Sequence, residues 1–100
     1  MIELSTFAWM SLGGFMNNKL LINIIVPTIQ LEFNVYIPNN KKIGTIKRHI
    51  LNSIVELSNG YYSYDIERVI LMDRDTGTEY SDNVIVNESN IQNGTKIIII

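Results

Sequence analysis

Residues 43–58 read IGTIKRHILNSIVELS. Apolar side chains recur there at spacings of three, four, four and three, at Ile43, Ile46, Ile50, Ile54 and Leu57. Because a helix has 3.6 residues per turn, this spacing forms one apolar stripe. Asn59-Gly60 follows, and both residue types tolerate the left-handed conformation that ends many helices. The sequence therefore predicts an amphipathic helix from about residue 43 or 44 to 58, with its stripe facing a sheet.

Two strands are predicted before the helix. Leu20 to Val26 is a nearly continuous apolar run, which suits a strand covered on both faces. Pro27-Thr28 interrupts it, since proline lacks the N–H that a central strand needs. From Ile29 to Ile37, apolar residues alternate with polar residues and Tyr36, which predicts one face toward the core and one toward water. Strands joined by so short a link are expected to form an antiparallel hairpin.

The chain after the helix predicts further strands and two turns. Val69–Met72 has the composition of a strand, and 73–77 (DRDTG) has the composition of a turn, after which 78–80 can return as a short strand. Asn93-Gly94 is a second turn signal, and 95–100 closes the fold. The four consecutive isoleucines in this last segment predict a central strand that is buried on both sides.

Composition excludes several classes of function. One hundred residues correspond to one domain. The absence of cysteine excludes a disulfide scaffold, a thiolate nucleophile and a cysteine metal site. A net charge of −2 gives no electrostatic reason to expect nucleic acid as a partner. Eighteen isoleucines and twelve asparagines, which have A/T-rich codons, are typical of a low-GC bacterial genome.

Residues 1–15 differ from the rest, since they hold the only Trp, the only Ala and a single charge. They are either a translated leader ahead of a start at Met16 or an apolar tail that docks on the domain or on a partner. Back-translation of 13–16 as GGA-GGA-TTT-ATG places a ribosome-binding purine run before Met16, which favours the leader. The segment lacks a basic signal region and is too short to span a bilayer, so direct membrane insertion is not expected. The domain is expected at 16–100.

Motifs for catalysis or metal binding are weak. Asp73, Asp75 and Glu79 resemble part of a calcium loop, but the third acid and the required spacing are missing, so a hairpin turn capped by Asp is preferred. His49 is the only histidine and has no cysteine or carboxylate beside it in the sequence. No phosphate-binding loop or serine triad can be assembled. We therefore expect no catalytic residue, metal or cofactor.

Basic side chains gather around the start of the predicted helix, at Lys41, Lys42, Lys47 and Arg48. They form either a solvated face or a docking patch for an acidic surface. The later half of the chain is acidic, through Asp65, Glu67, Asp73, Asp75, Glu79, Asp82 and Glu88. A chain polarised in this way favours oriented association with a partner.

The third predicted strand offers a second docking candidate. Arg68, Ile70 and Met72 alternate with Val69 and Leu71, which are expected to face the core. Ile70 and Met72, flanked by Arg68, would give a desolvated centre with a polar rim.

A tyrosine cluster precedes this strand, at Tyr61, Tyr62 and Tyr64. At least one of these rings is expected to cap the core beneath the helix end. Exposed tyrosines are also common interface anchors, so a role in binding stays open.

A family resemblance rests on four segments: 36–38 (YIP), the helix positions Ile43, Ile46 and Ile50, 68–71 (RVIL) and 89–97 (SNIQNGTKI). On these residues, 19–100 resembles ubiquitin-like proteins, and most of all the small bacterial YukD/EsaB group. The resemblance implies an α+β fold, a ubiquitin-like β-grasp with a mixed four- to five-stranded sheet packed on one helix. It also implies a non-catalytic, cytoplasmic accessory protein of type VII secretion, with partners in the secretion apparatus, although a shared fold does not fix function.

Ubiquitin and the sulfur carriers resemble this fold but end in a flexible Gly-Gly that an enzyme activates. Here the sequence reaches Ile100 inside the predicted last strand, so conjugation and sulfur transfer are not expected. Two alternatives stay open: a carrier-type protein that needs processing, and a regulator of an unrelated protein complex. The sequence sets neither the partner's identity nor the oligomeric state.

Overall fold

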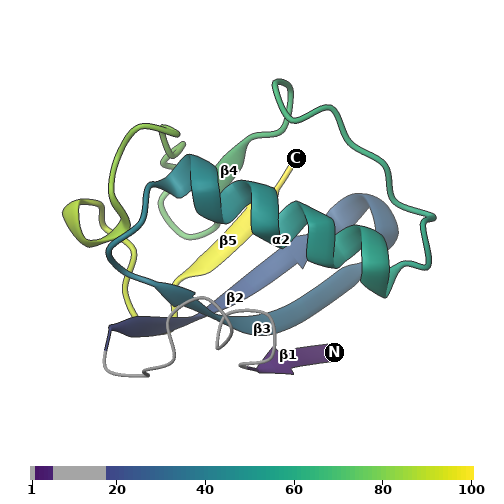
Figure 1. Cartoon of the computed structure of the whole chain (residues 1–100), viewed down its shortest axis with the longest axis horizontal. Coiled ribbons are helices and arrows are strands. Elements are labelled where there is room, and N and C mark those ends of the chain that lie inside the picture. Colours follow the sequence, from purple (N-terminus) through teal and green to yellow (C-terminus); the bar gives the residue numbers. More distant parts are fainter. Residues whose placement is uncertain (1, 6–17) are drawn as a thin grey trace.

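The computed structural model describes residues 2–5 and 18–100, which form a five-stranded sheet and helix α2 (Figure 1). The strands are β1 (Ile2–Ser5), β2 (Lys19–Val26), β3 (Leu31–Pro38), β4 (Leu71–Asp73) and β5 (Lys96–Ile99). The helix is α2 (Ile43–Leu57), and the short 3-10 turns are η1 (Pro27–Ile29) and η2 (Val86–Glu88). The predicted α+β architecture, a mixed sheet packed on one helix, is confirmed. Most of the segment 1–15, and with it the choice between a leader and a tail, lies outside the described residues.

The strand order in the sheet is β1-β3-β2-β5-β4. β2 and β3 pair antiparallel along their whole length, from Lys19 opposite Pro38 to Val26 opposite Leu31, which confirms the predicted hairpin. β5 lies parallel to β2 and antiparallel to β4, so the closing strand is central as predicted. The connection between α2 and β4, residues 58–70, brings the chain to β4, the edge strand at the opposite end of the sheet from β1.

Two strands begin two residues later than predicted. β3 begins at Leu31 because Ile29 belongs to η1 and Gln30 has a φ of 53°, a left-handed conformation that a strand cannot contain. β4 begins at Leu71 rather than at residue 69. The ladder nevertheless continues by one step, because Ile70 exchanges backbone hydrogen bonds with Ile100.

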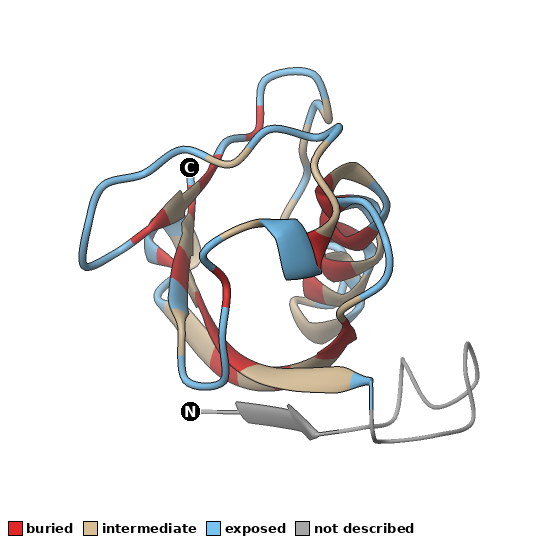
Figure 2. Ribbon diagram, turned by 90° about the vertical axis from the view of Figure 1, so that its left-hand side faces the viewer, coloured by how far each residue is buried: buried red, intermediate tan, exposed pale blue. Residues whose placement is uncertain are grey.

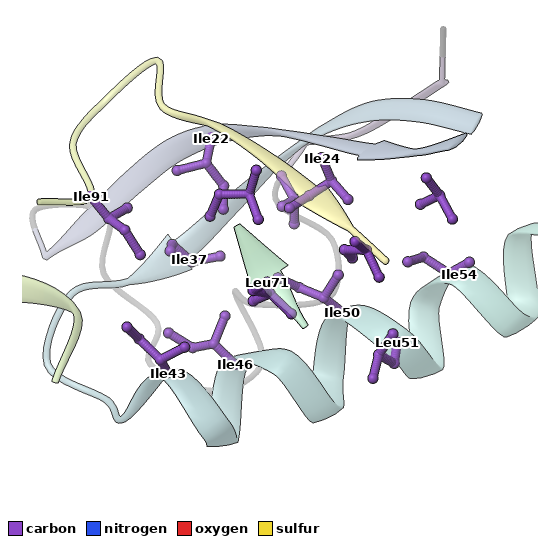
Figure 3. Packing of buried hydrophobic residues seen from close by; sticks show 14 of the residues in the cluster. Ile22, Ile24, Ile37, Ile43, Ile46, Ile50, Leu51, Ile54, Leu71 and Ile91 are labelled. Carbon is purple, nitrogen blue, oxygen red and sulfur yellow. The ribbon is translucent and has the colours of Figure 1, made fainter. Parts of the chain in front are cut away.

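The core lies between α2 and one face of the sheet (Figure 3). Ile46, Ile50 and Ile54 point from the helix toward Ile22 and Ile24 of β2, as the apolar stripe predicts. Their partners include the core-facing residues of β3 and the closing strand, Phe33, Val35, Ile37, Ile97 and Ile99. Leu57 is half-buried at the end of the stripe, whereas Leu51, which the stripe omits, is fully buried. The helix therefore buries a wider face than its sequence spacing predicts.

The closing strand is buried on one face only, contrary to the prediction. Ile97 and Ile99 are buried, Ile98 is half-buried and Ile100 is 55% exposed. The reason is the layer arrangement, since α2 packs on a single side of the sheet (Figure 2). Four identical residues carry no alternation, so their sequence could not separate the two faces.

Candidate protein-docking surface

The face of the sheet opposite α2 carries an apolar row that crosses three strands. Met72 of β4 lies opposite Ile98 of β5, and Ile98 lies opposite Ile25 of β2. All three side chains are half-buried, so each keeps part of its apolar surface accessible. Cross-strand neighbours in register lie about 4.5–5.5 Å apart at Cβ, close enough to act as one patch. We call Met72, Ile98 and Ile25 the outer row.

Ile70 and Ile100 extend the outer row at one corner of the sheet. The N–H of Ile70 donates to the Ile100 carbonyl at 3.0 Å, and the N–H of Ile100 donates to the Ile70 carbonyl at 3.0 Å. Ile70 is 40% exposed and Ile100 is 55% exposed. Val69 and Leu71 beside Ile70 are buried, which confirms the predicted alternation. The two exposed isoleucines are therefore held by the backbone in a fixed position next to Met72 and Ile98.

Arg68 stands at the rim of this corner. Its side chain is 87% exposed, and its Nε lies 3.6 Å from an Asp65 carboxylate oxygen. A long ion pair between two exposed side chains contributes little to stability, because water competes for both charges. The guanidinium can therefore turn toward a partner's carboxylate at small cost. The predicted trio Arg68, Ile70 and Met72 is thus gathered at one place in the fold.

An open cleft of about 440 Å³ adjoins the corner, and its lining includes Tyr61, Tyr62, Tyr64, Arg68 and Ile100. The rings of Tyr62 and Tyr64 stack with centroids 6.2 Å apart, and both pack against the core. The prediction that at least one tyrosine caps the core is confirmed. Burial, and then the neighbouring Tyr64, raise the pKa of Tyr62, so this phenol stays protonated. Tyr61 is 84% exposed and remains available to a partner.

The basic group at the start of α2 does not form one exposed patch. Lys41, Lys42 and Arg48 are exposed, but Lys47 is buried at 6% exposure. The Lys47 ammonium lies 3.0 Å from an Asp82 carboxylate oxygen and donates to the Val69 carbonyl at 3.1 Å. Lys47 therefore ties α2 to Val69 before β4 and to Asp82 after it. Because it is buried, Lys47 is not part of an exposed docking patch, contrary to the prediction.

The burial of Lys47 follows from the way residues 81–87 cover the start of α2. The N–H groups of Ile43 and Gly44 donate to the carbonyls of Val84 and Asp82, at 2.8 and 3.0 Å. No side chain caps the helix at Lys42, so these carbonyls satisfy the otherwise unpaired first N–H groups. A Cβ on Gly44 would lie only 3.0 Å from the Asp82 Cβ, which explains a glycine at the second helical position.

The remaining polar groups have structural roles or lie in shallow clefts. The Asp73 carboxylate accepts from the N–H groups of Asp75 and Thr76, at 2.8 and 3.1 Å, so the expected Asp-capped turn is confirmed. Burial alone would raise the pKa of Asp73, but these two bonds and the Tyr80 hydroxyl lower it overall. His49 is half-buried and lines a cleft with Lys42 and Arg48.

Across residues 18–100, no group of three or more His, Asp or Glu side chains is placed to hold a metal ion. In the same part of the chain, no helix has both the length and the apolar character needed to cross a membrane.

Comparison with known proteins identifies the fold. No protein-family model matches the chain, and no curated protein is similar in sequence. The ubiquitin-like domain of an Arabidopsis thaliana protein has a TM-score of 0.59 at 20% identity, covering 83% of this chain and 77% of that one. An N-terminal ubiquitin-like domain from a second protein has a TM-score of 0.60 at 16% identity, with 83% and 74% covered.

A chain of the ESX-5 inner membrane complex also shares the fold. Its TM-score is 0.66 at 14% identity, and the match covers 83% of this chain but 21% of that one. At these identities the likeness concerns the fold alone. The chain therefore has the ubiquitin-like β-grasp fold that the sequence resemblance implies.

Proposed function

We propose that this protein is a non-catalytic interaction module that docks a protein partner on the outer face of its sheet. The single observation that carries the proposal is the exposed Ile70–Ile100 pair, which continues the outer row of Met72, Ile98 and Ile25. The part of each side chain that stays exposed, 40% for Ile70 and 55% for Ile100, contributes nothing to folding. A partner that covers the exposed part gains roughly half of the 1.5–3 kcal/mol that complete burial of such a side chain contributes.

The arrangement of charge supports the same surface. Arg68 stands beside the apolar corner with its guanidinium in solvent. Interfaces typically combine a desolvated apolar centre with a polar rim, and arginine is enriched among their anchors. Arg48 lies on α2, and Lys41 and Lys42 directly precede it. The role of these exposed basic groups would be to steer an acidic partner during encounter rather than to form the buried contact.

The partner belongs, in this proposal, to a type VII-like secretion apparatus, and the protein acts in the cytoplasm. Two observations support this assignment: the sequence resemblance to the YukD/EsaB group and the shared fold with a chain of the ESX-5 inner membrane complex. Neither depends on the outer row, so the docking face and the identity of the partner are separate parts of the proposal.

A quantitative pull-down from the native host tests the docking face. Ile70→Glu should remove partner proteins that the wild type retains, because a carboxylate at the centre of the interface has to be desolvated. Asn87→Glu is the control, since it adds the same single negative charge at an exposed position of the segment that covers the start of α2, outside the outer row. Equal retention by wild type and Ile70→Glu, with both proteins folded, would exclude this face.

A further inference from the structure

Two basic residues, Arg74 and Lys96, lie directly opposite each other where the pairing of β4 with β5 ends. The register places Asp73 opposite Ile97. One step further along both strands, the N–H of Arg74 donates to the Lys96 carbonyl at 2.9 Å. Residues opposed in this way have Cβ atoms about 4.5–5.5 Å apart. The backbone therefore holds two cationic side chains next to each other.

Both of these side chains belong to the outer face of the sheet. Asp73 and Ile97, one step along each strand, are buried. Arg74 and Lys96 are exposed. Successive side chains of a strand point to opposite faces, so the two cations share the face that carries the outer row. They lie two residues along their strands from that row, a distance of about 6–7 Å.

Arg74 and Lys96 have no carboxylate partner among residues 18–100. The ion pairs of that part of the chain are formed by Lys47 and Arg68. Glu79 lies beside Met72 of the outer row rather than beside either cation. The positive charge at the end of the β4–β5 pairing is therefore left uncompensated by the described part of the protein.

This arrangement works against the stability of the isolated domain. Like charges directly opposite each other on a sheet repel and destabilise it. The chain has ten acidic residues and a net charge of −2, so its composition does not require two cations to be neighbours. Asn23, which lies opposite Lys96 on β2, carries no charge that could relieve the repulsion. An anion bound between the two side chains would relieve it.

We propose that Arg74 and Lys96 form a carboxylate clamp, which binds an Asp or Glu side chain of the protein partner that covers the outer row. The clamp rests on the proposed function and adds the chemistry of the contact. The partner presents a carboxylate about 6–7 Å from the apolar side chains that it packs on the outer row. A guanidinium and an ammonium both donate charge-assisted hydrogen bonds to such a group. The apolar outer row excludes water on one side of the clamp, which strengthens the attraction.

Thermal unfolding of the purified protein tests the repulsion. Lys96→Gln should raise the melting temperature by about 1–4 °C at low salt, and the gain should shrink in 1 M salt. Asn87→Glu is the matched control, because it also changes the net charge from −2 to −3, at an exposed position outside the outer row. Lys96→Arg keeps the two cations and should leave the melting temperature unchanged. No rise for Lys96→Gln at low salt would overturn the proposal.

Photo-crosslinking in the native host tests the contact itself. A photoreactive residue in place of Arg68 reports whether a partner covers the adjoining corner. Lys96→Gln should reduce the adduct about tenfold, because a charge-assisted hydrogen bond is lost. Lys96→Arg and Asn87→Glu should retain it. The same substitution, Lys96→Gln, is thus expected to stabilise the free protein and to weaken the complex, which a purely structural lysine would not do.

A water-soluble carbodiimide added to the crosslinked complex identifies the anion. The reagent activates a carboxylate as an O-acylisourea, the Lys96 amine attacks the acyl carbon, and the urea leaves as an amide bond forms. Mass spectrometry should map this bond between Lys96 and an Asp or Glu side chain of the partner. Lys41 and Lys42 are exposed and serve as reference amines outside the sheet face. Amide bonds to the partner at Lys41 or Lys42 and none at Lys96 would overturn the clamp.

The remaining outcomes separate the clamp from the docking face. An adduct at position 68 that survives Lys96→Gln overturns the clamp and leaves the docking face standing. No adduct at position 68 in the otherwise unchanged chain overturns both. A bond from Lys96 to a second copy of this chain, or to a chain-terminal carboxylate, would identify a different occupant and would also overturn the clamp.

Discussion

Ile70 and Ile100 are joined by two backbone hydrogen bonds of 3.0 Å, yet both side chains remain substantially exposed. The backbone therefore holds an apolar pair in place at a corner where the sheet has no helix over it. Such a pair adds little to the stability of the isolated domain. In the proposed function, its position beside Met72 and Ile98 makes it the centre of the contact with a partner protein.

Replacement of Ile50 by Ala should lower the free energy of unfolding by about 2–5 kcal/mol, because Ile50 is buried between α2 and the sheet. Urea unfolding measures the change. Ile70→Ala is the control and should stay within about 1 kcal/mol, since its side chain is already partly hydrated. A loss below about 0.5 kcal/mol for Ile50→Ala would show that α2 does not pack as described.

Lys47 should behave as a structural residue. Lys47→Ala should cost about 1–3 kcal/mol, because the buried Val69 carbonyl loses the ammonium that donates to it. Asp82→Asn should cost less than about 1 kcal/mol. The Asp82 side chain is 55% exposed, so water already weakens its ion pair with Lys47. Thermal and urea unfolding of both variants provide the comparison. A larger loss for Asp82→Asn than for Lys47→Ala would contradict the assigned roles.

Asp73 should link stability to acid pH. Its pKa is lower in the folded protein than in the unfolded chain, so its carboxylate stabilises the fold above the unfolded pKa of about 3.9. That contribution is lost as the pH falls through the folded pKa. Asp73→Asn removes the titration and keeps an acceptor oxygen. The stability gap between wild type and Asp73→Asn should therefore be widest above about pH 5 and shrink toward pH 3. A constant gap across this range would exclude the linkage.

Deletion of residues 97–100 should unfold the domain, because β5 pairs with β2 on one side and β4 on the other. The deletion also removes Ile97 and Ile99 from the core. Circular dichroism and a melting curve are the measurements. A dispensable tail would leave both unchanged, and that result would rule out a central β5.

Local periodicity predicted the parts of the structure that depend on neighbours in sequence. The spacing of Ile46, Ile50 and Ile54 gave the helix face, and the alternation around Ile70 separated inward from outward residues correctly. Lys47 was misjudged because its burial depends on where residues 81–84 cross the helix, a long-range contact that no local pattern contains. Met72 of the outer row was predicted, but Ile25 and Ile98 were missed for the same reason, since Ile25 meets Ile98 only through a parallel pairing of distant strands.

The most direct test of the docking face is site-specific photo-crosslinking in the native host. A photoreactive residue in place of Arg68, at the exposed rim of the corner, should form an adduct with the partner. The same residue in place of Glu56, exposed on α2, is the matched control and should form none. An adduct at position 68 that disappears when Ile70→Glu is added is the predicted result. An adduct at position 56 and none at position 68 would contradict the proposed docking face.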